Sequence, residues 1–156
     1  MKTGKIYLSG GGDENQTFTI DELFFRNIES VLYIPIAWKN DDFDSCLGWF
    51  RKMARLHKEV EVEMLVDWKK PVDLTRYHSV YVGGGNTFKL LKRLREGGLD
   101  KSLPEFYREG GIIYGGSAGA IIWGNKIDIA LICSDADENL VNLKNTKGFN
   151  FVNGFD

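Results

Sequence analysis

The sequence lacks any apolar run of the length that a membrane span requires. No stretch approaches the roughly 20 apolar residues of a transmembrane helix, and no signal-peptide pattern precedes the apolar residues 6–8. Its only cysteines, Cys46 and Cys133, lie far apart without metal-ligand spacing. Separate thiols of this kind are typical of a reducing compartment, so we expect a cytoplasmic protein with no membrane partner.

Histidine and charge of one sign are scarce as well. The chain has only two histidines, His57 and His78, which makes a zinc site improbable, and we expect no bound metal. The 20 Lys and Arg residues and 22 Asp and Glu residues are interspersed and give a net charge of −2. The sequence therefore carries no basic patch of the kind that binds nucleic acid.

What the sequence does have is an alternation of strand-like and helix-like segments. With 156 residues and 43% hydrophobic residues, it is long enough for one α/β domain with its own core. The alternation predicts a parallel sheet with right-handed crossovers. We expect strands at 6–9, 31–36, 60–66, 79–82 and 112–114, and helices at 21–28, 44–57, 87–95 and 103–108, with Pro104 in the first turn of the last helix.

The pattern becomes weaker beyond Trp123. Residues 126–133 look like a further strand or extended segment, 134–139 like an acidic loop, and 140–143 like another short strand. The segment 149–156 is rich in aromatic residues and resembles the approach to one more buried strand.

The most informative motif is Gly115-Gly116-Ser117-Ala118-Gly119, which lies between an apolar strand and an apolar helix-like run. A G-x-S-x-G motif in this context is typical of a nucleophile elbow, in which the serine hydroxyl is exposed by a strained turn. The alternative is a serine that only caps a helix. We expect Ser117 to lie at the carboxyl edge of the sheet, with Oγ facing the 83–86 loop and within about 10 Å of Gly84.

A second glycine-rich turn, Gly83-Gly84-Gly85-Asn86-Thr87, also joins a strand to a helix. Consecutive glycines before a helix N-terminus allow backbone N–H groups to converge on an anion, either a phosphate or the oxyanion of acyl transfer. The motif is neither G-x-G-x-x-G nor a Walker loop. A purely structural turn is the remaining alternative.

Together the two turns, roughly thirty residues apart, resemble the dipeptidase E and cyanophycinase family of serine peptidases. The segments 8–12 and 33–37 look like the same family, so the resemblance covers residues 4 to about 124. It implies a three-layer α/β/α sandwich similar to class I glutamine amidotransferases. It also implies a Ser–His–Asp or Ser–His–Glu triad that hydrolyses short aspartyl peptides through an acyl-enzyme, without metal or cofactor.

Carried over to this sequence, the resemblance makes Ser117 the nucleophile. It assigns the oxyanion hole to Gly84 or Gly85 together with the Ala118 N–H. The acid of the triad best matches Asp135, while Asp137 and Asp128 stay open because the spacing departs from the family pattern.

The general base is not found among the histidines. His78 precedes its strand and His57 ends a crossover helix, so both are expected at the amino edge of the sheet, opposite Ser117. The family places its histidine a few tens of residues after the elbow, about where this sequence stops. We expect a truncated form of a longer peptidase, rather than a shortened homologue, whose uncovered surface invites homo-oligomer formation. A non-catalytic domain that binds an anion or nucleotide in the glycine-rich pocket is the alternative function.

Overall fold

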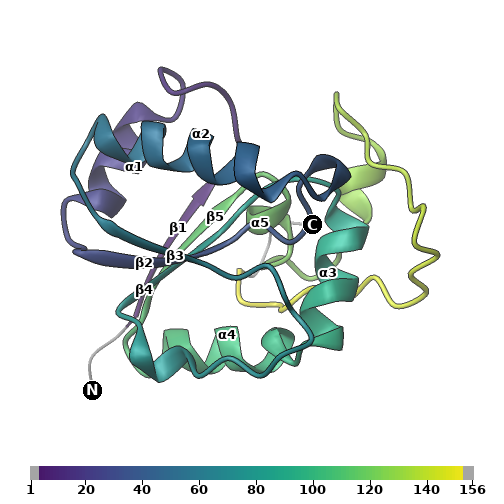
Figure 1. Ribbon diagram of the computed structural model, residues 1–156. Coiled ribbons are helices and arrows are strands. Elements are labelled where there is room, and N and C mark those ends of the chain that lie inside the picture. The colour runs from purple at the N-terminus through teal and green to yellow at the C-terminus, as the bar shows by residue number, and fades with distance from the viewer. Residues whose placement is uncertain (1–3, 153–156) are drawn as a thin grey trace.

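The computed structural model describes residues 4–152 and consists of a five-stranded parallel sheet between two layers of helices (Figure 1). The strands lie in the order β1-β5-β4-β2-β3. Their bounds are β1 Lys5–Ser9, β2 Ser30–Ile34, β3 Glu61–Met64, β4 Ser79–Val82 and β5 Ile112–Gly116. The fold class predicted from the sequence is therefore confirmed.

Two separate hydrophobic clusters show that helices cover both faces of the sheet. The helices α1 (Phe18–Phe25) and α2 (Phe43–Arg55) pack on an aromatic cluster on one face. The helices α3 (Thr87–Glu96), α4 (Leu99–Arg108) and α5 (Ala118–Ile121) bury a mostly aliphatic cluster on the other. Three short 3₁₀ segments complete the described elements: η1 Lys39–Asp41, η2 Leu74–Arg76 and η3 Asp128–Leu131.

Side-chain caps explain where two of the helices begin. Asp42 accepts a hydrogen bond from the Ser45 N–H at the start of α2, and Asn86 accepts one from the Lys89 N–H at the start of α3. Helix α1 begins three residues before the predicted position 21 and lacks such a cap. Asp21 consequently lies inside the first turn of α1 and faces the protein interior.

The predicted start of α4 is wrong. The helix begins at Leu99, directly after Gly98, which has a φ of 74°. Pro104 therefore lies in the interior of the helix instead of in its first turn. Its ring is buried against the core, so packing outweighs the loss of one intrahelical hydrogen bond.

Two strands predicted after Trp123 are also wrong. Residues 126–133 contain the 3₁₀ segment η3 and one isolated bridge, between Lys126 and Lys147, and residues 140–143 form a turn followed by irregular chain. Some apolar residues of this region, such as Ile127 and Leu143, pack against the sheet domain, whereas others, such as Ile132 and Leu140, are exposed. Of the predicted final strand, residues 149–152 are irregular, and 153–156 lie outside the described residues.

Aromatic packing and backbone hydrogen bonds hold this C-terminal segment in place. The fully buried Trp123 ring contacts Phe149 and Phe151 edge-on, with centroid distances of 5.0 and 5.5 Å. The N–H groups of the same two phenylalanines donate to the carbonyls of Ile122 and Trp123. From α3, Arg95 donates hydrogen bonds to two carbonyls of the segment.

The sheet order places three glycine-containing turns side by side. Strands β1, β5 and β4 are neighbours and run parallel, so their carboxyl ends meet at one edge of the sheet. The turns at that edge are 10–12, 115–119 and 83–85, and β5, which leads to Ser117, is the middle strand. In parallel α/β sheets, ligand sites form at this edge. Within residues 4–152, no helix is both long and apolar enough to cross a bilayer.

Candidate active site

Ser117 occupies a strained turn between β5 and α5. Its φ of 51° and ψ of −115° lie in a region that costs a non-glycine residue about 1–3 kcal/mol. The Ser117 N–H donates to the Ser9 carbonyl at 2.8 Å, which ties the turn to β1. The side chain is exposed although Gly116 and Ala118 on either side are buried. The strained, exposed turn predicted for Ser117 is thus present.

Close packing of strand and helix explains the glycines of the motif. A Cβ on Gly119 would lie 2.2 Å from the Val82 carbonyl oxygen, and one on Gly115 would lie 2.2 Å from the Gly119 carbonyl oxygen. Contacts this short do not occur between real atoms, so a side chain at either position would push α5 away from β4 and β5. The turn geometry therefore depends on both glycines.

Two glycine loops lie on either side of the Ser117 side chain. A Cβ on Gly11 or on Gly84 would be 3.2 Å from the Ser117 Cβ, and 3.7 or 3.8 Å from its Oγ. The Ser117 side chain therefore lies between the 83–86 loop and the 10–12 loop, well within about 10 Å of Gly84, as predicted. The absence of side chains at Gly11 and Gly84 leaves room beside Oγ for a substrate carbonyl.

Backbone donors are available next to this space. In the part of the chain that the structure describes, the N–H groups of Gly84 and Gly85 donate no hydrogen bond to protein, whereas the Gly83 N–H donates to the Ile34 carbonyl. Ala118 is the first residue of α5, so its N–H has no partner within the helix. Gly85 has a φ of 120° and packs against the Ala37 carbonyl. The predicted oxyanion donors are therefore unpaired, and their role stays a prediction.

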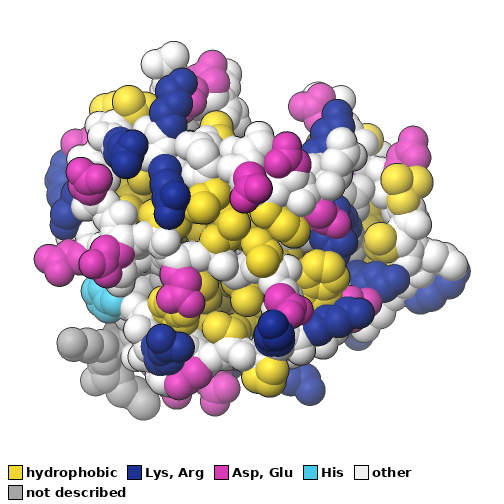
Figure 2. All heavy atoms as spheres, viewed as in Figure 1, with side chains coloured by type: hydrophobic (Ala, Val, Ile, Leu, Met, Phe, Trp, Pro, Cys, Tyr) yellow, Lys and Arg dark blue, Asp and Glu magenta, His cyan; other side chains and the backbone are white. Residues whose placement is uncertain are grey.

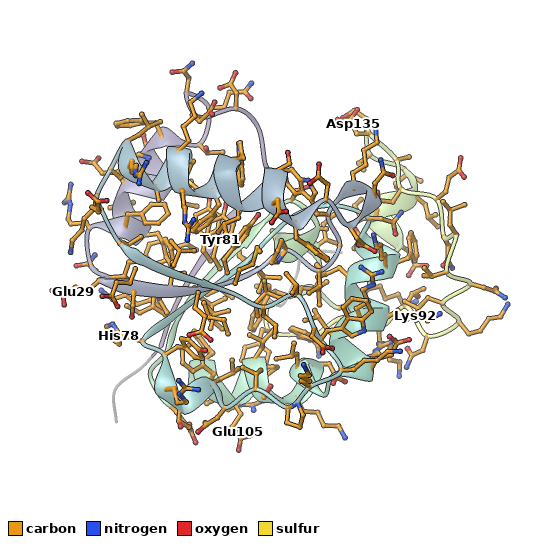
Figure 3. All side chains as sticks on the ribbon, viewed as in Figure 1. Glu29, His78, Tyr81, Lys92, Glu105 and Asp135 are labelled. Carbon is orange, nitrogen blue, oxygen red and sulfur yellow. The ribbon has the colours of Figure 1, made fainter. Side chains whose placement is uncertain are left out.

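The first of two cavities at Ser117, the Asp21 cavity, lies between the sheet and helices α1 and α2. Its volume is about 290 Å³, and it reaches from Ser117 and Gly84 to the carboxylate of Asp21. Aromatic side chains form its walls, and Figure 3 shows one of them, Tyr81, beneath α2. The aromatic residues are Trp38, Trp49, Tyr81 and Tyr114.

A hydrogen-bond network holds the buried end of the Asp21 cavity. Asp21 is only 2% exposed, and it accepts hydrogen bonds from the Tyr114 hydroxyl at 2.5 Å and from the Thr17 hydroxyl at 2.6 Å. Tyr114 stacks on Tyr81 with a centroid distance of 4.3 Å. Burial, and for Tyr114 also the hydrogen bond to Asp21, raise the pKa of both tyrosines, so both hydroxyls stay protonated donors.

The second cavity, the Asp137 cavity, lies on the other side of Ser117 and has a volume of about 390 Å³. Its walls come from the 83–87 turn, from α5 and from the acidic loop 133–139. Asp137 in this loop accepts hydrogen bonds from the N–H and the hydroxyl of Thr87, at 2.7 and 2.6 Å. Asp137 therefore caps α3 and holds the loop against the Gly83–Asn86 turn.

The three candidate acids of the triad occupy different environments. Asp137 is engaged with the α3 N-terminus, and Asp128 accepts a hydrogen bond from the Thr146 hydroxyl at 2.8 Å. Asp135 is exposed, lines the Asp137 cavity together with Ser117, and lies at the outer end of its loop in Figure 3. Asp135 stays a prediction, and the helix-capping role of Asp137 makes that residue a weaker alternative.

Neither histidine lies at the Ser117 edge of the sheet. The His57 ring stacks on Phe25, and its two nitrogens have no hydrogen-bond partner within residues 4–152. His78 precedes β4, and its carbonyl accepts from the N–H of Ile112, the first residue of β5. Figure 3 shows His78 at the end of the molecule opposite Asp135. Nor does any cluster of three or more His, Cys, Asp or Glu residues suited to a metal occur in the described chain.

No sequence motif indicated the residues that shape the Asp21 cavity, among them Trp38, Trp49 and Tyr114. The predicted helix begins at Asp21, a position where an acid is commonly exposed. The signal that could have found Asp21 is its position between apolar neighbours, in Ile20-Asp21-Glu22-Leu23-Phe24.

A parallel α/β sheet with a serine in a strained strand–helix turn defines a class of hydrolase-like folds. The chain belongs to peptidase family S51, whose model matches residues 6–155.

Individual relatives agree with this membership. "Uncharacterized peptidase Lmo0363" of Listeria monocytogenes is 42% identical over 74 residues, which are 47% of this chain and 35% of the relative. "Probable alpha-aspartyl dipeptidase" of Drosophila melanogaster is 29% identical over 106 residues, 64% of this chain and 41% of the relative. The matched segments thus span well under two thirds of these relatives.

A solved structure, "Putative Peptidase E Protein" from Listeria monocytogenes, superposes with a TM-score of 0.76 and 26% identity, over 96% of this chain and 76% of that one. A peptidase from an acI-B1 actinobacterium shares the fold, with a TM-score of 0.61 and 17% identity.

Proposed function

We propose that this protein is a serine peptidase of the dipeptidase E type, in which Ser117 attacks the peptide carbonyl and forms an acyl-enzyme. The observation that carries the proposal is the position of the Ser117 hydroxyl. It projects from a strained turn into the space between two glycine loops at the carboxyl edge of the sheet. Strain of this kind persists only where the surrounding structure enforces it, and it is common at catalytic groups.

Stabilisation of the developing negative charge is the second part of the proposal. The N–H of Gly84 or Gly85, together with that of Ala118, would donate to the oxyanion. In proteases, loss of one such donor typically lowers kcat by about 10²–10³-fold. The unpaired state of the glycine N–H groups supports this role, because no protein acceptor competes for them within the described residues.

Asp135 is our candidate for the acid that orients the base. It shares the Asp137 cavity with Ser117, and its carboxylate is free of the helix-capping contacts that engage Asp137. The imidazole base itself is not one of the two histidines of this chain, because both lie away from Ser117. Without a base, Ser117 keeps the weak nucleophilicity of an ordinary alcohol, so we expect the 156-residue chain to hydrolyse peptides only feebly.

The proposed substrates are short aspartyl peptides in the cytoplasm. The support for this substrate class is the relative named as an alpha-aspartyl dipeptidase. The cytoplasmic location is compatible with two separate thiols, one of them, Cys46, in the core.

The alternative function, binding of an anion or nucleotide at the glycine-rich turn, is less well supported. Such a site needs the free N–H groups at the start of α3. The carboxylate of Asp137 already accepts from the Thr87 N–H, so a phosphate there would have to displace a negatively charged side chain.

The test compares hydrolysis of aspartyl dipeptides by two proteins. One is the 156-residue chain, and the other is a chimera that adds the C-terminal part of the Listeria relative Lmo0363. Each is assayed with Ser117 and with Ser117→Ala. We expect feeble hydrolysis by the short chain and faster, Ser117-dependent hydrolysis by the chimera. Equal activity of a chimera with Ser117→Ala would contradict the nucleophile assignment. Ser117-dependent turnover by the short chain at the chimera's rate would contradict the absence of a base.

A further inference from the structure

The Asp21 cavity contains a buried carboxyl group that the protein does not pair with a cation within the described residues. Asp21 is almost fully buried, and its two hydrogen-bond donors, Tyr114 and Thr17, are neutral hydroxyls. Within residues 4–152, no Lys, Arg or His forms an ion pair with it. A buried carboxylate without a cation is costly, so a cationic ligand that reaches it gains more than it would from an exposed carboxylate.

The carboxylate can still accept further hydrogen bonds. Two ionised oxygens offer about four acceptor positions, and the hydroxyls of Tyr114 and Thr17 use one on each oxygen. Asp21 is also one of the residues that line the cavity, so a donor bound there lies next to this carboxyl group. A group with several N–H donors would fit this end of the cavity.

The walls of the cavity favour a cation as well. Two aromatic pairs line it: Tyr81 with Tyr114, and Trp38 with Trp49, whose ring centroids are 5.7 Å apart. Aromatic faces attract ammonium groups, most strongly where water is excluded. Of the described residues that line the cavity, none is Lys, Arg or His, and Glu14 adds a second acid. An aspartyl carboxylate would therefore find no cationic partner here.

We propose that the Asp21 cavity binds a protonated primary amine, namely the free amino terminus of a peptide substrate. The inference rests on the proposed peptidase function, because the cavity also contains Ser117. A peptide held by its terminal ammonium in this cavity presents its first residues to the serine. Asp21 then restricts cleavage to bonds near a free amino terminus, and the aspartyl side chain must be recognised outside this cavity.

Binding to the 156-residue chain tests the proposal without any need for turnover. The probes are alanyl-leucinamide, which has a free amino terminus and a neutral side chain, and its N-acetyl form. Two of the four tryptophans, Trp38 and Trp49, line the cavity, so their indole N–H signals in NMR spectra report occupancy. Trp68, which stacks under Arg93, serves as the internal control. We expect the free amine to bind about tenfold or more tightly than the acetylated probe and to shift only the cavity signals.

Variants assign this preference to Asp21. Asp21→Asn keeps the shape and removes the charge, so the preference for the amine should fall to about twofold or less. Asp44→Asn removes an exposed carboxylate from α2 and should leave the preference unchanged. If Asp21→Asn does not fold, the comparison of the two probes on the wild-type chain still tests the proposal, because equal affinity for both probes overturns it. Equal binding of N-acetyl-lysinamide would also overturn it, by showing that any amine is accepted.

A Ser117→Ala chain separates this proposal from the proposed catalytic function. The amine preference should persist in that variant, because Asp21 and the aromatic walls are unchanged. Loss of hydrolysis with retained amine binding would support both proposals. Ser117-dependent hydrolysis with no amine preference would overturn only the assignment of the Asp21 cavity.

Discussion

The Asp21 and Asp137 cavities meet at Ser117 but are built in different ways. The Asp21 cavity is part of the aromatic core beneath α1 and α2, and its polar end is a buried network of Asp21, Tyr114 and Thr17. The Asp137 cavity is closed by an exposed loop that is held mainly by hydrogen bonds to the start of α3. The first cavity therefore has a shape set by core packing, whereas the second can change with a single loop.

Figure 2 shows a broad hydrophobic area across the middle of the visible face, bordered by basic and acidic side chains that alternate. Charged contacts also tie a loop to this body, for example those of Asp41 with Lys89 and Arg93. Loss of a core residue should thus cost stability, and loss of a loop contact should mainly change local order.

The largest effect on stability is expected from a change in the Ser117 turn, which both cavities share. Gly119→Ala places a Cβ 2.2 Å from the Val82 carbonyl oxygen, so α5 must move, and we expect a loss of about 3 kcal/mol in the free energy of unfolding. Gly10→Ala is the matched control, because a Cβ there has no neighbour within 4 Å. Urea denaturation measures the unfolding free energy of both variants. Similar values would contradict the close packing of the Ser117 turn.

A smaller loss of stability is expected from a change at the buried end of the Asp21 cavity. Tyr114→Phe removes the hydroxyl that donates to Asp21 and leaves a buried carboxylate oxygen with one partner fewer. We expect a loss of about 1–3 kcal/mol in unfolding free energy. Tyr7→Phe is a suitable control because Tyr7, a half-buried residue of β1, has no hydroxyl hydrogen bond within the described residues. Equal stability of the two variants would show that the network does not stabilise the cavity.

The loop of the Asp137 cavity should respond differently. Asp137→Ala removes the two hydrogen bonds to Thr87 at the start of α3 and leaves the Asn86 cap in place, so we expect a loss of about 1 kcal/mol in unfolding free energy. Amide hydrogen exchange should increase in 133–139 while the sheet stays protected. Asp135→Ala, in the same loop, should leave stability and exchange nearly unchanged. Faster exchange in the sheet of Asp137→Ala would contradict the independence of the loop.

The smallest effect concerns Asp41, which holds the Trp38 segment against α3. Hydrogen bonds from Arg93, and then from Lys89, hold the pKa of Asp41 well below its usual range. Its stabilising contribution is present above the unfolded pKa of about 4 and is lost as pH falls through the lower folded value. Because Asp41 is partly exposed, we expect a contribution of about 1 kcal/mol or less.

Denaturation of wild type and Asp41→Asn at a series of pH values measures this contribution. The stability difference should be constant near neutral pH and shrink below about pH 4. A difference that grows on acidification would contradict the assigned direction of the pKa shift.

The sheet and the Ser117 turn could be predicted from the sequence because their signals are local. Short apolar runs mark the strands, and the glycines of 83–85 and 115–119 mark turns that only a small residue can form. The segment after Trp123 could not be predicted in this way. Its apolar residues are placed by contacts with distant helices, such as that of Phe151 with Tyr107, and these contacts have no local pattern.

The candidate site also contains residues that could be predicted from the sequence and residues that could not. Ser117 and Gly84 follow from strand order and glycine spacing, since neighbouring parallel strands bring their carboxyl ends together. The environment of Asp21 does not follow from its sequence position, because α1 begins three residues before the predicted start and packs this acid against the core. The capping of α3 by Asp137 joins residues 50 positions apart, so no local pattern indicates it.

The most direct test of the central claim is to locate the acyl group after reaction with an aspartyl p-nitrophenyl ester. Without a base, both acylation and deacylation are slow. The p-nitrophenolate leaving group speeds only the acylation, so an ester on Ser117 accumulates. Trypsin releases the peptide 109–126, in which Ser117 and Tyr114 are the only hydroxyl groups, and hydroxylamine removes esters but not amides formed on lysines. The account predicts a hydroxylamine-sensitive acyl group on Ser117 that is absent from Ser117→Ala. An unmodified Ser117 in a chain acylated at other serines would contradict it.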